Sequence, residues 1–170
     1  MTAKKKLTNE DSLECFGMTN LTSDGYFIPF FDYDDVSLRR VIEELSFLQE
    51  SYHLSDIYII KSSNGYNALS LDKISWEILI QIMRESERAD VSFKKLAIER
   101  RFFVLRIGKD KKIVEILKGF SEYKKSLSHA LALKCFYNLP IPLEDNFDDN
   151  TIMRMYLYKS AKDGYLRVMK

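Results

Sequence analysis

The chain has 170 residues, of which 46% are hydrophobic and 30% are charged, and its formal net charge is +1. This length and apolar content fit one folded domain and argue against wholesale disorder, while the balanced charge does not favour a protein that coats long stretches of nucleic acid. The two cysteines, Cys15 and Cys135, match no zinc spacing. No signal peptide or membrane-spanning apolar run is recognisable, so we expect a cytoplasmic protein with no membrane partner.

In chain order, the polar residues 1–24 predict a loosely ordered leader, and residues 25–170 predict a single α+β domain. Residues 25–33 are rich in aromatics and predict a strand, in which Pro29 points to an edge position or a bulge. Apolar residues recur at the helical period over 37–52, which predicts a helix with one buried face.

A hairpin is the next expected element. Residues 57–60 and 66–71 have strand composition, and Asn64-Gly65 lies between them. An Asn-Gly pair is typical of a tight turn, and we therefore expect Gly65 to have positive φ. A helix over 75–87 follows.

The next expected elements are a short helical stretch near 91–99 and a strand over 102–107. The order strand, helix, strand, strand, helix, strand predicts a split βαβ arrangement, as in RRM-like and ferredoxin-like folds. All four strands, 25–33 and 102–107 included, are expected in one antiparallel sheet, with the helices on one face and the other face free for a ligand.

The C-terminal part, residues 111–170, predicts an extension of this unit. Residues 112–117 are compatible with a strand or with the start of a helix. A helix is expected over 121–137, and a β-hairpin is expected from residues 152–158 and 165–169 around Asp163-Gly164.

Two aspartates at the end of the first strand are the main candidates for chemistry. Asp32 and Asp34 are two residues apart, so in a strand their carboxylates point to the same face. Such a pair offers the oxygen ligands that Mg²⁺ and Mn²⁺ prefer. Alternatively, the two aspartates have only a structural role, because aspartates are common where a strand ends beside a helix cap.

Further candidates follow along the chain. The segment 61–67 combines Lys61, hydroxyl groups including Ser63, a glycine turn and Asn67, and it could donate hydrogen bonds to a triphosphate; the alternative is an ordinary hairpin. Arg106 interrupts an apolar strand and Lys109 follows it. These two could face the open side of the sheet or a plain surface. Asp90 is either a further carboxylate of the site or a helix cap.

Taken in order, these pieces resemble the palm of the archaeo-eukaryotic primase superfamily over residues 25–110. An apolar strand ending in Asp-x-Asp resembles Phe30-Phe31-Asp32-Tyr33-Asp34, and a Ser, Gly, Tyr, His segment resembles Ser62-Ser63-Asn64-Gly65-Tyr66-Asn67. A third motif, an aspartate before a Leu-Arg strand, resembles Asp90 and then Leu105-Arg106-Ile107-Gly108. The sequence departs from the family at Asn67, which stands where the family has histidine.

The resemblance implies a metal-dependent nucleotidyltransferase of primase-polymerase type, with nucleic acid and a nucleoside triphosphate as partners. Asp32, Asp34 and Asp90 would be the catalytic carboxylates and would hold Mg²⁺ or Mn²⁺. The nucleotide would be bound by Lys61, Ser63, Asn67, Arg106 and Lys109. The chain would be a minimal or degenerate core, of a kind carried by plasmids or viruses.

A different class of function is also compatible with the sequence. The alternative is a non-catalytic nucleic-acid-binding module or replication accessory protein, in which Tyr26, Tyr58, Tyr66 and Phe103 stack on bases across an open sheet face. Divalent metal distinguishes the two, because the enzyme needs it and the stacking module does not. A structural subunit with an apolar patch and no cleft is the third possibility.

Overall fold

The computed structural model describes residues 16–106, 111–139, 146–148, 157–160 and 166–168. The elements within these ranges are β1 (Phe16–Thr19), β2 (Phe30–Asp34), α2 (Leu38–Tyr52), β3 (Ile57–Lys61), β4 (Gly65–Ser70), α3 (Trp76–Glu85), α4 (Val91–Arg100), β5 (Val104–Arg106), β6 (Lys112–Leu117), α5 (Leu127–Tyr137), β7 (Leu157–Ser160) and β8 (Leu166–Val168). The chain therefore has the expected α+β fold with antiparallel sheets and helices packed on a sheet.

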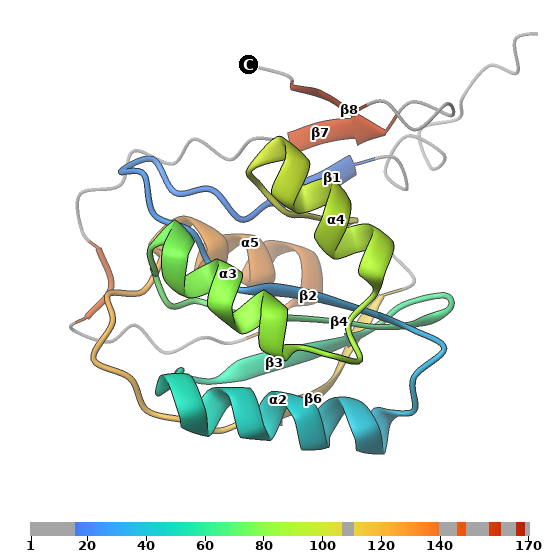
Figure 1. Ribbon diagram of the computed structural model, residues 1–170. Helices are drawn as coiled ribbons and strands as arrows, with labels where there is room; N and C mark the ends of the chain where they lie inside the picture. Colours follow the sequence, from blue (N-terminus) through green and yellow to red (C-terminus); the bar gives the residue numbers. More distant parts are fainter. Residues whose placement is uncertain (1–15, 107–110, 140–145, 149–156, 161–165, 169–170) are drawn as a thin grey trace, which may run out of the picture.

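The central sheet has the strand order β2-β4-β3-β6, and all neighbours in it are antiparallel. Helices α2 and α3 lie on one face of it, as predicted (Figure 1). The two helices are joined at their ends, where the Tyr52 hydroxyl donates to Glu85 at 2.7 Å. Helix α5 lies on the opposite face, where the ring of His129 meets Phe30 edge-on at 6.2 Å. That face is thus only partly open.

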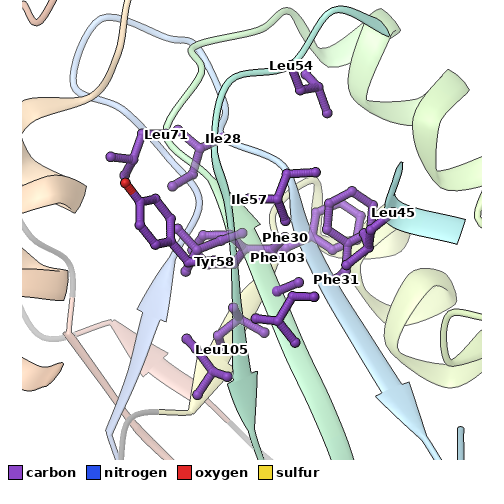
Figure 2. Packing of buried hydrophobic residues seen from close by; sticks show 14 of the residues in the cluster. Ile28, Phe30, Phe31, Leu45, Leu54, Ile57, Tyr58, Leu71, Phe103 and Leu105 are labelled. Carbon is purple, nitrogen blue, oxygen red and sulfur yellow. The ribbon is translucent and has the colours of Figure 1, made fainter. Parts of the chain in front are cut away.

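Alternation along β2 sorts its side chains between the two faces. Phe31 and Tyr33 stack at 6.4 Å on the α2 side, and Figure 2 shows Phe31 beside Leu45 of α2. Phe30 points to the α5 side, and all three aromatic side chains are fully buried. By the same alternation, Asp32 points to the side of Phe30. The aromatic residues anchor β2 in the core and leave its carboxylate-bearing end at the part of the α5 face that the helix does not cover.

The prediction that strand 102–107 joins the sheet of 25–33 is wrong. Strand β5 pairs with β1 in a second sheet of order β5-β1-β7-β8, with Gly17 opposite Arg106. The fourth place in the central sheet belongs to β6, which pairs with β3. Hydrophobic alternation shows which face of a strand is buried, but it does not identify the neighbouring strand, and the partner of β5 comes from a segment with little strand character.

That segment also corrects the predicted N-terminal leader. Residues 16–24 belong to the fold, because β1 pairs on both sides, with β5 and β7. The buried Asn20 then links two segments: its side chain donates to Ile28 O at 3.1 Å and accepts from Phe103 N at 2.9 Å. Residues 1–15 lie outside the described part of the chain.

The β3–β4 hairpin is present, but its turn differs from the prediction. Lys61 pairs with Tyr66, so four residues separate the paired ends, and Ser62 N donates to Gly65 O at 3.0 Å. Among the described glycines, Gly25 has positive φ and Gly65 does not. Glycine is needed at 65 for another reason: a Cβ atom there would lie 1.8 Å from the carbonyl oxygen of Tyr33 on β2.

The C-terminal elements are of the predicted types: a strand, a helix and a β-hairpin. Residues 112–117 form a strand, and the predicted helix begins at 127 because Ser126 caps it and accepts from His129 N. Strands β7 and β8 pair as the expected hairpin, although its turn at Asp163-Gly164 lies outside the described residues. None of the described helices is long and apolar enough to cross a bilayer.

Candidate active site

Three carboxylates from two parts of the chain lie close together at the C-terminal end of β2. Asp32 and Asp34 come from β2, and Asp90 precedes α4. One oxygen from each lies within 4.8 Å of the others. The backbone holds this arrangement, because the N–H of Asp90 donates to the carbonyl of Asp32 at 2.7 Å. The three predicted carboxylates are therefore brought together in space.

Asp90 has a structural role as well. Its Oδ2 accepts from the backbone N–H of Phe93 at 2.7 Å, so it is the N-cap of α4. The two interpretations of Asp90 from the sequence are compatible, since the cap bond uses one carboxylate oxygen and leaves a second for another ligand.

Negative charge accumulates at this position. The pKa of Asp32 is raised from 3.8 to about 6, mainly by burial and further by the charges of Asp34 and Asp90, while Lys111 and Asn67 act in the opposite direction. The pKa of Asp34 is also raised, by burial first and then by its acidic neighbours Asp90 and Asp35. A cation between the carboxylates would relieve this repulsion.

The donor set fits Mg²⁺ or Mn²⁺. Both are hard cations that bind carboxylate oxygens and complete their shells with water and phosphate. Hydrogen bonding engages Oδ1 of Asp32 and Oδ2 of Asp90, so each of these residues can still offer its second oxygen. The partly exposed position of the group leaves room for waters and for a substrate.

Asp32 and Asp34 line a cleft of about 470 Å³ that also carries basic and hydroxyl-bearing residues. Its polar wall comes from β5, from the β3–β4 turn, and from Lys111, which precedes β6. Its apolar wall comes from α4 and β5. The residues that line it are Gly17, Asp32, Asp34, Ser62, Ser63, Asn64, Asn67, Phe93, Leu96, Arg100, Val104, Leu105, Arg106 and Lys111.

Asn67 and Lys111 connect the acidic and basic sides of this cleft. Asn67 is only 5% exposed, and its Nδ2 donates to Oδ1 of Asp32 at 2.7 Å. Its Oδ1 accepts from Lys111 Nζ at 3.2 Å, and Lys111 also donates to Arg106 O at 2.5 Å. Burial and the charge of Arg106 lower the pKa of Lys111 to about 8, although Asp32 acts against this.

The structure sorts the other predicted site residues into three groups. Ser63, Asn67 and Arg106 line the cleft with Asp32 and Asp34. Lys61 does not, because strand alternation places it with Tyr66 on the opposite face, where its Nζ lies 4.4 Å from the Tyr66 ring centroid. Lys109 lies outside the described residues.

Sequence reasoning missed Lys111 and Arg100. Lys111 belongs to the run Lys109-Asp110-Lys111-Lys112, in which no periodicity distinguishes one lysine from the next. Arg100 is in the last turn of α4, a position where a basic residue is ordinary. Both residues lie near a predicted motif in the sequence, but nearness to a motif does not identify which side chain enters the site.

Comparisons of this chain with protein-family models, with curated proteins and with solved structures give no match. The functional argument therefore rests on the geometry of the cleft.

Proposed function

We propose that this protein is a metal-dependent nucleotidyltransferase of primase-polymerase type, which uses a nucleoside triphosphate to extend a nucleic acid. One observation carries the proposal: Asp32 and Asp34, which line a cleft with Arg106 and Lys111, lie within 4.8 Å of a third carboxylate, Asp90. Transfer of a nucleotide requires a set of oxygen ligands for the metal and a positive surface for the phosphates. The cleft offers both.

The roles of the residues follow from their positions. Asp32, Asp34 and Asp90 would hold Mg²⁺ or Mn²⁺, which would supply the positive charge that activates a 3′-hydroxyl and stabilises the leaving pyrophosphate. Arg106 and Lys111 would bind the phosphates. Ser63 on the turn would donate a hydrogen bond to them. The contribution of the protein is thus positioning and neutralisation of charge.

The order of the motifs along the chain supports the same function. Asp-x-Asp on β2, the segment ending in Asn67 on β4 and Leu-Arg on β5 all contribute to the cleft. Asn67 stands where the resemblance implies histidine, and asparagine donates hydrogen bonds without carrying charge. Lys111, in contact with Asn67, would bring positive charge to the same place.

The non-catalytic stacking module gains less support. Two of its four aromatic residues are in the core, since Tyr58 is 6% exposed and Phe103 is fully buried. Tyr66 lies on the face that carries Lys61, away from the carboxylates. A base could therefore not stack on the four rings together.

The test is calorimetric titration of Mn²⁺ with a non-hydrolysable nucleoside triphosphate into wild type and the Asp32→Asn/Asp34→Asn protein. We expect a saturable heat in wild type that the double variant loses. The matched control is Asp56→Asn, an aspartate that pairs with Lys118 at 2.9 Å on the surface and should leave the heat unchanged. Equal heats from wild type and the double variant would show that Asp32 and Asp34 are purely structural. Extension of a labelled primer on a template then tests turnover.

A further inference from the structure

A second groove, of about 720 Å³, adjoins the candidate active site. It runs between β6 and the end of α5, and it is lined by Lys111, Lys112, Ile113, Val114, Glu115, Ile116, Phe136, Tyr137, Asn138 and Leu139. Lys111 lines both hollows, so the groove and the cleft adjoin at this residue. The groove thus lies beside the cleft that Asp32 and Asp34 line.

The lining of the groove is aromatic at one side and basic at the end near the cleft. Phe136 is 39% exposed, and Tyr137 beside it is half-buried. Lys111 stands where the groove meets the cleft. An exposed ring next to a lysine offers stacking to a base and charge to a phosphate.

We propose that this groove binds single-stranded nucleic acid and guides the strand toward the carboxylate cleft, with Phe136 stacking on a base and Lys111 contacting the backbone. The proposal rests on the proposed function, because it assigns the groove to the nucleic acid that the cleft would act on. Lys111 lies at the junction, where the strand would meet the bound nucleotide.

Another occupant of the groove would be an extended peptide. β6 is the last strand in the order of the central sheet, and an outer strand can accept a further strand from a partner. The observations favour nucleic acid, because the groove adjoins, at Lys111, a cleft that carries carboxylates and basic residues. In addition, its most exposed ring lies on α5 and not on the strand edge.

The test is fluorescence anisotropy with labelled 12-nucleotide oligo(dT) and oligo(U), in low salt with EDTA and without nucleotide. We expect wild type to bind and Phe136→Ala to bind roughly 5- to 100-fold more weakly, as for the loss of one stacked base. The matched control is Phe47→Ala, a ring 59% exposed on α2 on the other side of the sheet, which should bind as wild type does.

The outcomes separate this proposal from the proposed function. Equal affinity of wild type and Phe136→Ala for the oligonucleotides would overturn the groove assignment, as would the absence of binding by wild type. Binding of unrelated extended peptides that competes with the oligonucleotide would overturn it in favour of strand addition at β6. The Mn²⁺ titration of Phe136→Ala should equal that of wild type, so a loss of metal and nucleotide binding is detected independently of the groove.

Discussion

The side-chain amide of Asn67 donates to Oδ1 of Asp32 at 2.7 Å, across the pair that β2 and β4 form. The two residues are directly opposite in the register, so the sheet itself fixes the contact. Lys111 approaches the other end of the same amide. Asn67 therefore orients one carboxylate of the site and one lysine of its basic wall at the same time.

We expect Lys111→Met to weaken the binding of a nucleoside triphosphate roughly 10- to 100-fold in the presence of Mn²⁺, because a charge-assisted bond to phosphate is lost. The measurement is the calorimetric titration described above. Lys61→Met is the matched control, since Lys61 lies on the opposite face of the hairpin and stacks on Tyr66. A comparable loss in both variants would indicate a general effect of charge and not a contact at the site.

The raised pKa of Asp32 predicts how stability depends on pH without metal. Because its pKa is about 6 in the folded chain and 3.8 ordinarily, the folded state holds this proton over a range where the unfolded state has lost it. Asp32 therefore reduces stability as pH rises from about 4 to about 6. In EDTA, Asp32→Asn should gain stability over wild type at pH 7.5, and the gain should be smaller at pH 4.5. Urea midpoints measure this, and a difference that does not change with pH would contradict it.

The same pKa predicts competition between protons and metal. A saturating concentration of Mn²⁺, about 100-fold above its dissociation constant, should raise Tm by roughly 5–10 °C at pH 7.5. The rise should be smaller at pH 5, where Asp32 is largely protonated. Differential scanning fluorimetry in both buffers gives the comparison. The Asp32→Asn/Asp34→Asn protein should show no such rise at either pH.

Gly65→Ala should destabilise the fold by roughly 1–3 kcal/mol, because the added methyl group would meet the carbonyl oxygen of Tyr33 and force β2 and β4 apart. The midpoint of urea denaturation checks this. Asn64→Ala changes the neighbouring exposed residue of the same turn and should shift the midpoint little. An unchanged midpoint in Gly65→Ala would mean that the two strands can separate without cost.

Local patterns in the sequence predicted the elements that bury one regular face. Helix α2 has Val41, Leu45 and Leu48 buried on one side, and this period is visible in the sequence. The strand partner of β5 was not predictable in the same way. The apolar composition of residues 102–107 indicates a strand, but the choice between β1 and the central sheet as its partner depends on contacts between segments far apart in the chain.

The residues of the candidate site also divide into those that a local sequence pattern predicts and those that depend on long-range pairing. Asp32 and Asp34 were predictable because a strand fixes the direction of residues two apart. Lys111 was not, because its position depends on the register of β6, which shifts between Ile59 and Ile60 of its partner β3. A shift of the register by one residue would have brought a different residue of the run to Asn67.

Substitutions at Asp90 can separate its role as a helix cap from its proposed role as a metal ligand. Asparagine caps helices about as well as aspartate, so Asp90→Asn should keep the bond to the N–H of Phe93 and the stability of α4. It removes a negative charge from the three carboxylates, however, and should weaken Mn²⁺ binding.

Asp90→Ala should lose both functions, with a stability cost of about 1 kcal/mol from the missing cap. Ser75→Ala removes the equivalent cap of α3, where the hydroxyl accepts from Ile78 N at 3.3 Å, and should lower stability without affecting the metal. Urea denaturation and Mn²⁺ titration of all three variants give the two readouts. If Asp90→Asn bound Mn²⁺ as wild type does, Asp90 would be a cap alone, and the metal would depend on Asp32 and Asp34.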